Sequence, residues 1–568
     1  MPQPLLQERQ KLLLLGNEAL ARGALEAGLG FATTYPGTPA SEIGDTLAKL
    51  AKEAGIYFEY SVNEKVALEL AAAAAASGVR ALVAMKHVGL NVAADAFISV
   101  VYTGTRAGLL IVTADDPGMH SSQNEQDNRY YAYLSGAPLL EPSGPKEAYI
   151  MAKAAFTISE ELELPVLLRT TTRVSHTRSA VEVGELPRPQ ERKVRGEFVK
   201  DPFRFVIVPS VARRLHKLLL ERLERAETLA EESPFNSVLG EGEELGIATS
   251  GVSYTYVCDA IEELGLWDRV RVLKLGLSHP LPRGLVTRFL KAVKKILVVE
   301  ELEPLLEGAL RALSQELGLM IEIYGKGTAG LSRLYEYDPD RVKGALAQVL
   351  GLALAGVEPL PELDLGKLPD RPPVLCPGCP HRASYYALKL ALGEEFKETI
   401  FTTDIGCYTL GLLPPLSMAD YLLCMGSSLG TAGGFARATG RRVVAFIGDS
   451  TFFHAGLPAL VNAVHNRHKF LVVVLDNRTT AMTGHQPHPG LGLEGAEAIL
   501  IEELVSGCGV RRVHLIDPFD LQGAVATFKE ALKESEEEVT VVISRHPCAL
   551  IEAETETETE AEAEAEED

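Results

Sequence analysis

The sequence predicts an α/β fold of several domains, in each of which helices cover both faces of a parallel sheet. Short apolar runs alternate with amphipathic segments of helical period along most of the chain. Several of these segments end in Gly, and turn-rich loops lead to the next apolar run. This alternation is typical of parallel sheets that are buried under helices. The chain has 568 residues, which at about 100–200 residues per domain indicates about three to five domains.

The first domain is expected to span residues 1–190. Asn17 and Asn63 stand where helix caps are expected, and Gly28 and Gly78 follow the helices that these residues open. The expected helices are 18–27, 41–54 and 64–77, and the expected strands are 12–15, 57–62, 81–85, 109–113 and 164–169. The run 12–15 is apolar enough to be a buried strand.

Two further α/β domains are expected, at residues 244–356 and 374–550. A linker with a charged helix, 191–243, precedes the former, and the Pro-rich segment 357–373 is predicted to be a linker to the latter. The expected strands are 245–249, 270–275 and 296–299 in the former and 443–447, 470–475 and 539–544 in the latter. The acidic segment 551–568 is predicted to be a disordered, solvated tail, with a docking arm for a basic partner as the alternative.

Composition and charge exclude several classes of protein. The formal net charge of −22 argues against binding of nucleic acid, which needs clustered Lys and Arg. No unbroken run of about 18 apolar residues is present, so no membrane span is expected. The start MPQPLLQERQ lacks the basic and apolar regions of a secretory signal. Seven cysteines in this spacing do not form a secreted disulfide framework, so we expect a cytoplasmic protein.

Polar residues follow two predicted strands of the third domain. Asp449 comes after strand 443–447, and Asn477 comes after strand 470–475, with a helix predicted between the strands. The carboxyl ends of parallel strands meet at one edge of a sheet, where ligands bind. Oxygen ligands of this kind suit Mg²⁺, which keeps substrate phosphates as co-ligands, and Gly448 allows a close approach of backbone to phosphate. An ordinary βαβ unit with turn residues at its strand ends is the alternative.

This stretch resembles the thiamine-diphosphate motif, which is written GDG, then about 25 residues, then a pair ending in Asn. Here GDS occupies 448–450, 25 residues follow, and the pair DN ends the motif. Ser450 replaces the usual third Gly and leaves both metal ligands in place. The resemblance implies thiamine diphosphate bound through Mg²⁺, with Asp449, Asn477 and the carbonyl of Thr479 as protein ligands.

Eight stretches together resemble the large subunit of the indolepyruvate:ferredoxin oxidoreductases, a branch of the 2-oxoacid:ferredoxin oxidoreductase family. They are LLLGNEALARGALEAG, TTYPGTPASEI, YSVNEKVALE, MKHVGLNVAAD, ADDPGMHSSQNEQDNRYYA, PVLLRTTTRVSH, CPGCPHR and TTDIGCYTLG. The resemblance covers residues 12–550. It implies transketolase-like, thiamine-diphosphate-binding domains: a pyrimidine-binding domain first, a transketolase-C-like domain second and a diphosphate-binding domain third.

The resemblance also implies catalytic residues in the first domain. Glu64, which opens a predicted helix after strand 57–62, would bind N1′ of the cofactor and so favour removal of the C2 proton. By position alone, Glu64 would instead be a first-turn acid favoured by the helix dipole. Thr38 in YPGTP would face the substrate carboxylate. His87 and Arg129 are candidate active-site cations, with ordinary structural roles as the alternative, such as a surface salt bridge for Arg129.

Cysteines are the third group of candidate ligands. Cys376 and Cys379 form CPGC at the start of the third domain, and Cys407 lies in DIGCY. Such a set suits an iron–sulfur cluster or zinc, although CxxC also occurs as a redox or structural motif without metal. The resemblance implies a [4Fe–4S] cluster held by Cys376, Cys379 and Cys407, with Cys548 preferred as the fourth ligand and Cys424 as the alternative.

Members of this family usually end in a ferredoxin-like domain with two runs of closely spaced cysteines. No CxxCxxCxxxCP run is found in this sequence. We therefore expect electrons to leave from the CPGC cluster directly, or through another protein. Ferredoxin or a similar protein is the expected acceptor.

The expected function is oxidative decarboxylation of aryl-2-oxo acids such as indolepyruvate, with coenzyme A, to acyl-CoA, CO₂ and reduced ferredoxin. This chain would be the catalytic large subunit, and the resemblance implies a separate small subunit with a γ-type domain. The first alternative is a non-oxidative thiamine-dependent decarboxylase or carboligase. The second is an oxidoreductase of non-aryl 2-oxo acids, and the third is a non-catalytic cofactor-binding or assembly subunit.

Overall fold

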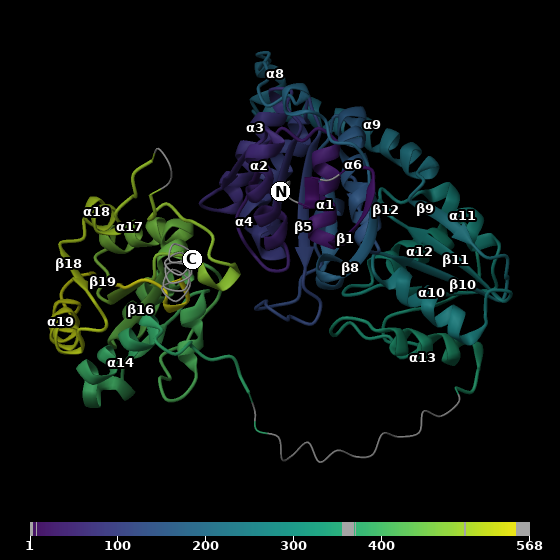
Figure 1. The fold of residues 1–568 in the computed structure, drawn as a ribbon. Helices are drawn as coiled ribbons and strands as arrows, with labels where there is room; N and C mark the ends of the chain where they lie inside the picture. The colour runs from purple at the N-terminus through teal and green to yellow at the C-terminus, as the bar shows by residue number, and fades with distance from the viewer. Residues whose placement is uncertain (1–3, 7, 355–368, 370, 493–495, 552–568) are drawn as a thin grey trace, which may run out of the picture. The chain divides into compact units, whose positions relative to one another are not determined.

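The computed structural model describes residues 4–6, 8–354, 369, 371–492 and 496–551 (Figure 1). The chain divides into two compact units, Met1–Leu360 and Pro361–Asp568. The first unit contains both α/β domains expected before the Pro-rich linker, and the second contains the third. The expected linker 357–373 lies almost entirely outside the described residues, and so does the expected tail 551–568.

The first unit is built on a seven-stranded sheet with the order β12-β6-β7-β5-β4-β2-β3. All neighbouring strands in it are parallel except β12 and β6. Its strands are β2 (Phe31–Thr34), β3 (Tyr57–Tyr60), β4 (Ala81–Lys86), β5 (Leu109–Asp115), β6 (Leu139–Leu140), β7 (Val166–Thr171) and β12 (Leu277–His279). The central strands are buried along their whole length, as expected for a parallel sheet that is covered on both faces.

Two helical layers cover this sheet. One consists of α1 (Gly16–Glu26), α2 (Ser41–Ala54) and α6 (Pro145–Leu162), and the other contains α3 (Glu64–Ala76) and α4 (His87–Thr103). The predicted bounds of α2 are confirmed, and the predicted cap of α3 is confirmed by Asn63 Oδ1, which accepts a hydrogen bond from Val66 N over 2.9 Å. Asn17 is not a cap: it lies inside α1, and its side chain donates to the carbonyl oxygen of Pro39.

The first predicted strand has a different place from the one expected. Residues 12–15 belong to β1 (Gln10–Leu15), which pairs antiparallel with β8 (Arg178–Val183) in a separate two-stranded sheet. Leu14 is buried, but the side chain of Leu13 is 66% exposed. The prediction of a strand is confirmed, whereas the prediction that it is buried is wrong, because alternate side chains of this strand point to solvent.

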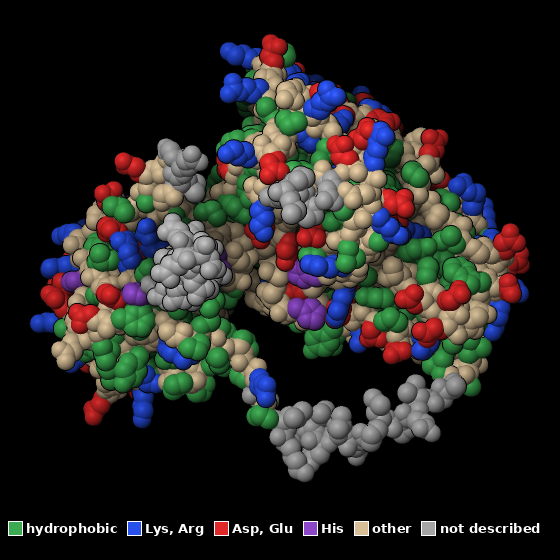
Figure 2. All heavy atoms as spheres, viewed as in Figure 1, with side chains coloured by type: hydrophobic (Ala, Val, Ile, Leu, Met, Phe, Trp, Pro, Cys, Tyr) green, Lys and Arg blue, Asp and Glu red, His purple; other side chains and the backbone are tan. Residues whose placement is uncertain are grey.

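A second sheet of the first unit has the order β14-β13-β10-β11-β9. Its strands are β9 (Asn236–Leu239), β10 (Leu245–Ser250), β11 (Val270–Leu275), β13 (Lys295–Val299) and β14 (Glu322–Tyr324). Helices α9 (Pro209–Glu232), α10 (Ser253–Leu264), α11 (Arg283–Lys291), α12 (Leu305–Glu316) and α13 (Pro339–Leu350) accompany it. Strand β12 follows β11 in sequence and joins the first sheet, so backbone hydrogen bonds connect the two expected domains. Basic and acidic side chains are interspersed over the face of this unit in Figure 2.

The second unit has a five-stranded parallel sheet with the order β15-β16-β17-β19-β18. Its strands are β15 (Ile400–Thr402), β16 (Val443–Gly448), β17 (Leu471–Asp476), β18 (Arg512–Ile516) and β19 (Thr540–Arg545). Alternate residues of β16 enter two different cores. Val444 and Phe446 pack with α14 (Pro380–Leu392) and α19 (Leu521–Glu534), whereas Ala445 and Ile447 pack with α15 (Ser427–Thr439) and α17 (Leu457–His465). Helices therefore cover both faces, as the sequence predicts.

No helix among the described residues is long and apolar enough to cross a membrane.

Candidate functional site

The metal ligands predicted in the second unit come together at the carboxyl edge of its sheet. Strands β16 and β17 are parallel neighbours with Gly448 opposite Leu475, so Asp449 and Asn477 leave the sheet side by side. Asp449 is 3% exposed and Asn477 is 6% exposed. Asp449 also begins the helical segment after β16, where its Oδ1 accepts a hydrogen bond of 2.7 Å from Ser450 N. One carboxylate oxygen is therefore fixed by backbone, and Oδ2 faces Asn477.

Three oxygen-bearing groups converge at this edge. The Asn477 side-chain amide donates hydrogen bonds to Asp449 Oδ2 over 3.3 Å and to the carbonyl oxygen of Thr479 over 2.9 Å. A half-turn of this amide would instead place its oxygen beside the other two, where one cation could contact all three. Carboxylate, amide and carbonyl oxygens are the ligands that Mg²⁺ prefers. The residues present therefore fit a Mg²⁺ ion.

His488 completes the surroundings of this carboxylate. Its Nε2 lies 3.1 Å from Asp449 Oδ2, and both side chains are buried. Its Nδ1 accepts a hydrogen bond from Gly490 N over 3.1 Å, which leaves the ring proton on the nitrogen that faces Asp449. Burial alone would raise the pKa of Asp449, but the hydrogen bond with His488 holds it below its usual value. His488 was not predicted, because it lies on a loop outside the strand ends that carry the motif.

A packing contact, different from the predicted approach to a phosphate, requires glycine at position 448. A Cβ atom at this position would lie 2.5 Å from Cε1 of Tyr408. The Tyr408 ring is buried, and its hydroxyl is within 3.1 Å of Thr451 Oγ1. The φ angle of Gly448, −80°, is open to any residue. Gly is therefore needed here to accommodate an aromatic ring from the neighbouring segment, which the sequence could not indicate.

Four of the candidate cysteines are neighbours in the second unit. Burial, and after it the nearby thiolates of Cys379, Cys548 and Cys376, raise the pKa of the Cys407 thiol to about 11. Burial raises the pKa of Cys379 as well, and the charges of Cys376 and Cys548 act in the same direction. Four thiolates crowded together destabilise one another unless a metal neutralises them. This donor set fits a thiolate-bound metal or cluster.

Cys424 has different surroundings. The charge that raises its pKa after burial is that of Asp404, not that of another cysteine. Cys548, in contrast, is attached to the metal edge, since its backbone N donates to the carbonyl oxygen of Asn477 over 3.0 Å. Within the described part of the chain, no three His, Cys, Asp or Glu side chains are already positioned as metal ligands. The proposed Mg²⁺ site does not meet this description because two of its donors are an amide and a backbone carbonyl. The four thiols do not meet it because they are neighbours but do not surround a common point.

Glu64 lies in the first unit, at the first position of α3, and is 6% exposed. The neighbouring helix α4 has Gly89 in its first turn. A Cβ atom at Gly89 would lie 2.6 Å from both Cγ and Oε1 of Glu64. The missing side chain of Gly89 therefore makes the space that the Glu64 carboxyl occupies. The string MKHVGL contains this glycine, but only packing of the two helices reveals its purpose.

Thr38 lies in the loop after β2 and is partly exposed. Its carbonyl oxygen accepts a hydrogen bond of 3.2 Å from Ser121 Oγ. The carbonyl oxygen of the same Ser121 accepts a hydrogen bond of 2.7 Å from Lys86 Nζ. Lys86 was not predicted as a site residue, although it ends strand β4 directly before His87.

The two predicted active-site cations, His87 and Arg129, have different surroundings. Burial, and next the charge of Lys86, lower the pKa of His87 to about 4, so this imidazole is neutral near pH 7. Arg129 is 2% exposed; it binds Asp127 through two nitrogens and Glu300 through Nη1 over 2.7 Å. Its Nη2 also donates to the carbonyl oxygen of Glu301 over 3.0 Å. The alternative of a surface salt bridge is wrong for Arg129, since the pair is buried and connects the first sheet to the second.

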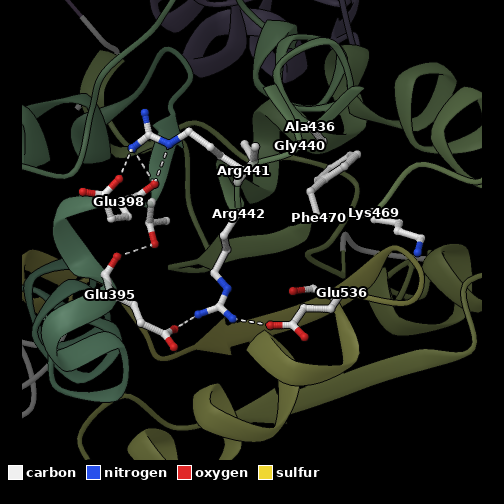
Figure 3. Close-up of a pocket in the computed structure, with 12 residues that line it drawn as sticks. Glu395, Glu398, Ala436, Gly440, Arg441, Arg442, Lys469, Phe470 and Glu536 are labelled. Atoms are coloured by element: carbon white, nitrogen blue, oxygen red, sulfur yellow. Dashed lines mark hydrogen bonds and ion pairs between the residues drawn. The ribbon is translucent and has the colours of Figure 1, made fainter. Parts of the chain in front are cut away.

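A pocket at the other edge of the second unit's sheet lies near the amino ends of β16 and β17. Figure 3 shows Arg442 extended between Glu395 and Glu536, and it forms ion pairs with both. Arg441 donates to the carbonyl oxygen of Glu398 over 2.9 Å. Because Arg441 and Arg442 of this pocket are paired with acids and the predicted metal ligands lie at the opposite edge, it is not the candidate cofactor site.

Comparisons with known proteins match each of the two units separately. The model of pyruvate flavodoxin/ferredoxin oxidoreductase, thiamine diphosphate-binding, matches residues 22–214. The model of the thiamine pyrophosphate enzyme C-terminal TPP-binding domain matches residues 404–544. One model thus covers Glu64 and the other covers Asp449 and Asn477.

Two curated relatives match nearly the whole chain. Indolepyruvate oxidoreductase subunit IorA of Methanothermobacter marburgensis is 54% identical over 553 residues, which is 95% of this chain and 87% of the relative. The protein of the same name from Archaeoglobus fulgidus is 45% identical over 556 residues, 96% of this chain and 87% of the relative. A solved 2-oxoglutarate:ferredoxin oxidoreductase from Magnetococcus marinus aligns with a TM-score of 0.49 and 17% identity, over 60% of this chain and 65% of that one.

Proposed function

The chain belongs to the family of indolepyruvate oxidoreductase subunit IorA, and from this membership we propose that it oxidatively decarboxylates aryl-2-oxo acids. It is a thiamine-diphosphate-dependent 2-oxoacid:ferredoxin oxidoreductase subunit. In the proposed reaction a 2-oxo acid such as indolepyruvate and coenzyme A give acyl-CoA and CO₂, and two electrons pass to ferredoxin or a similar protein.

The second unit would bind the diphosphate end of the cofactor. Asp449, Asn477 and the Thr479 carbonyl would hold Mg²⁺, with the cofactor phosphates as further ligands. Gly448 and Ser450 would lie beside those phosphates. Support comes from the Asn477 side-chain amide, which reaches both Asp449 Oδ2 and the Thr479 carbonyl oxygen within 2.9–3.3 Å. When bound, thiamine diphosphate supplies a nucleophilic carbon for the keto group and a place for the electron pair left when CO₂ departs.

Glu64 would act at the pyrimidine end. Its carboxyl group would hold a proton at the pyrimidine N1′ atom and so make the adjacent amino group basic enough to take the C2 proton. Its burial, and the space that Gly89 leaves for it, support this role because both keep water from competing for the carboxyl. Thr38 would contact the substrate carboxylate. Neutral His87 would act as a hydrogen-bonding group and not as a cation.

The oxidative part of the proposal rests on one observation, the grouping of Cys376, Cys379, Cys407 and Cys548. A [4Fe–4S] cluster held there would supply the single-electron steps that oxidation by ferredoxin requires. The link from Cys548 N to the Asn477 carbonyl connects this group with the metal edge. A non-oxidative thiamine-dependent decarboxylase has no use for four grouped thiols. We place the enzyme in the cytoplasm, where unpaired cysteines stay reduced.

A separate small subunit with a γ-type domain is the proposed partner. The experiment that tests the function uses this chain copurified anaerobically with that subunit. Iron content and absorption are measured first, and then turnover of indolepyruvate, phenylpyruvate and pyruvate with coenzyme A and ferredoxin. Iron with acyl-CoA formation supports the proposal. Aldehyde formation without iron would assign the enzyme to the non-oxidative class, and a preference for pyruvate would overturn the aryl assignment.

A further inference from the structure

Lys86 lies beside the proposed substrate loop. It is the last residue of β4 and directly precedes the first residue of the 17-residue helix α4. A Cβ atom at Gly37 would lie 2.9 Å from Cβ of Lys86 and 3.6 Å from its Cδ. The loop residue next to Thr38 therefore lacks a side chain where the Lys86 stem passes. Ser121 binds both residues, through its carbonyl oxygen to Lys86 Nζ and through its hydroxyl to the Thr38 carbonyl.

The ammonium group of Lys86 keeps donors for a ligand. Its one hydrogen bond to a described residue is to Ser121, over 2.7 Å, and an ammonium has three N–H groups. Asp116 is the nearby acid, but its two oxygens accept from Ser121 N, Ser122 Oγ and Thr172 Oγ1 over 2.6–2.8 Å. Among the described residues, no acid forms an ion pair with Lys86. The negative charge of Asp116 thus acts on Lys86 without a direct hydrogen bond to its ammonium group.

The surroundings favour an anion at this position. The backbone at Lys86 stands at the N-terminal end of α4, where the helix carries partial positive charge. The neighbouring ring of His87 is neutral, so it neither repels a cation nor competes for an anion. The half-buried position weakens screening by water and strengthens a charged hydrogen bond.

We propose that Lys86 binds the carboxylate of the 2-oxo acid substrate, together with Thr38. This inference rests on the proposed function, in which a 2-oxo acid is bound next to Thr38. The carboxylate loses its charge as CO₂ departs, so an ion pair with Lys86 stabilises the bound substrate at least as much as the transition state. Removal of the ammonium therefore raises KM and does not lower kcat. The phosphates of coenzyme A are the other anions in the reaction, and the experiment separates them from the carboxylate.

The test compares Lys86→Met with Lys65→Met in the enzyme copurified with its small subunit. Lys65 is a matched control, because its side chain is 50% exposed and forms an ion pair with Glu69 one turn away. We expect Lys86→Met to raise KM for the 2-oxo acid at least about tenfold. KM for coenzyme A, the affinity for thiamine diphosphate and the circular dichroism spectrum should stay unchanged. Lys86→Arg should restore most of the affinity, because it restores the charge.

Binding of 3-phenylpropanoate and of its uncharged amide, measured without turnover, gives the second readout. The wild-type protein should prefer the carboxylate, and Lys86→Met should bind both equally. An unchanged KM for the 2-oxo acid, or an unchanged preference for the carboxylate, overturns the inference. A rise in KM for coenzyme A alone overturns it as well. If the wild-type enzyme turns over no 2-oxo acid, the proposed function fails, whereas the binding measurement still decides the role of Lys86.

Discussion

The side-chain amide of Asn477 donates hydrogen bonds to Asp449 Oδ2 over 3.3 Å and to the Thr479 carbonyl oxygen over 2.9 Å. Strands β16 and β17 impose this closeness, because parallel neighbours in register bring their following residues to the same edge. His488 holds Asp449 ionised from a further side, at 3.1 Å. The closeness of Asp449 and Asn477 is thus a property of the backbone, and it places both side chains where they can share one cation.

Asn477→Ala tests this site directly. The variant loses one of three ligand oxygens. Loss of a group that only orients a metal ligand weakens metal binding about 10- to 100-fold. Asn477 would be a ligand itself, so we expect thiamine diphosphate binding to need at least about tenfold more Mg²⁺. Calorimetric titration of the cofactor at several Mg²⁺ concentrations measures it. Asn466→Ala is the control, because that exposed amide binds only its own helix at Asn462. Equal Mg²⁺ requirements in both variants would contradict the assignment.

Gly89→Ala should disable Glu64 without unfolding the protein. Ala is about 0.5–1 kcal/mol more favourable than Gly in a helix, but its Cβ would lie 2.6 Å from the Glu64 carboxyl and displace it. We expect bound thiamine diphosphate to lose fast exchange of its C2 proton for deuterium, as in Glu64→Gln, while its affinity changes little. Exchange is followed by NMR after acid quench. Gly430→Ala in α15, which meets no atom within 4 Å, should exchange normally.

Patterns among neighbouring residues predicted much of this architecture. Features that depend on contacts between residues far apart in the sequence could not be predicted from such patterns. The cap at Asn63 and the apolar run of β16 are recognisable from neighbouring residues, so α3 and the sheet could be predicted. The closeness of Asp449 and Asn477 follows from the order of the strands and could be predicted as well. The position of His488 depends on how a loop returns to a strand end. The grouping of Cys376 with Cys548 depends on contact between α14 and β19, which no local pattern encodes, so only the family resemblance could suggest it. The roles of Gly89 and Gly448 appear only when the opposing side chain is known.

Cys548→Ser and Cys424→Ser should differ in their iron content. Cys548 adds its charge to the group of Cys376, Cys379 and Cys407, whereas Cys424 does not. We expect Cys548→Ser to lose most iron and the visible absorption of a cluster, and Cys424→Ser to keep both. Iron analysis and electron paramagnetic resonance after reduction measure the difference. Full iron in Cys548→Ser together with loss in Cys424→Ser would reverse the choice of the fourth ligand.

Arg129→Met should lower the free energy of unfolding, in addition to any effect on turnover. The variant leaves Asp127 and Glu300 buried without their cation, which typically destabilises a protein by about 3–5 kcal/mol. We expect a clearly lower urea midpoint, followed by circular dichroism. Arg333→Met is the control, because Arg333 is 61% exposed in its pair with Glu303 and should leave the midpoint unchanged. If Arg129→Met kept the midpoint but lost turnover, the residue would act on the substrate and not as a connection within the first unit.

The affinity for the 2-oxo acid should fall as pH rises through about 8. Burial lowers the pKa of Lys86 to about 8, against the opposing field of Asp116. Lys86 is charged below this value and neutral above it, so an anion is held at low pH and released at high pH. His87 has a pKa of about 4 and does not titrate in this range. The inhibition constant of 3-phenylpropanoate, measured from about pH 6 to 9.5, should be flat and then rise about tenfold per pH unit. In Lys86→Arg the rise should vanish, because a guanidinium keeps its proton throughout; a rise that persists would come from another group.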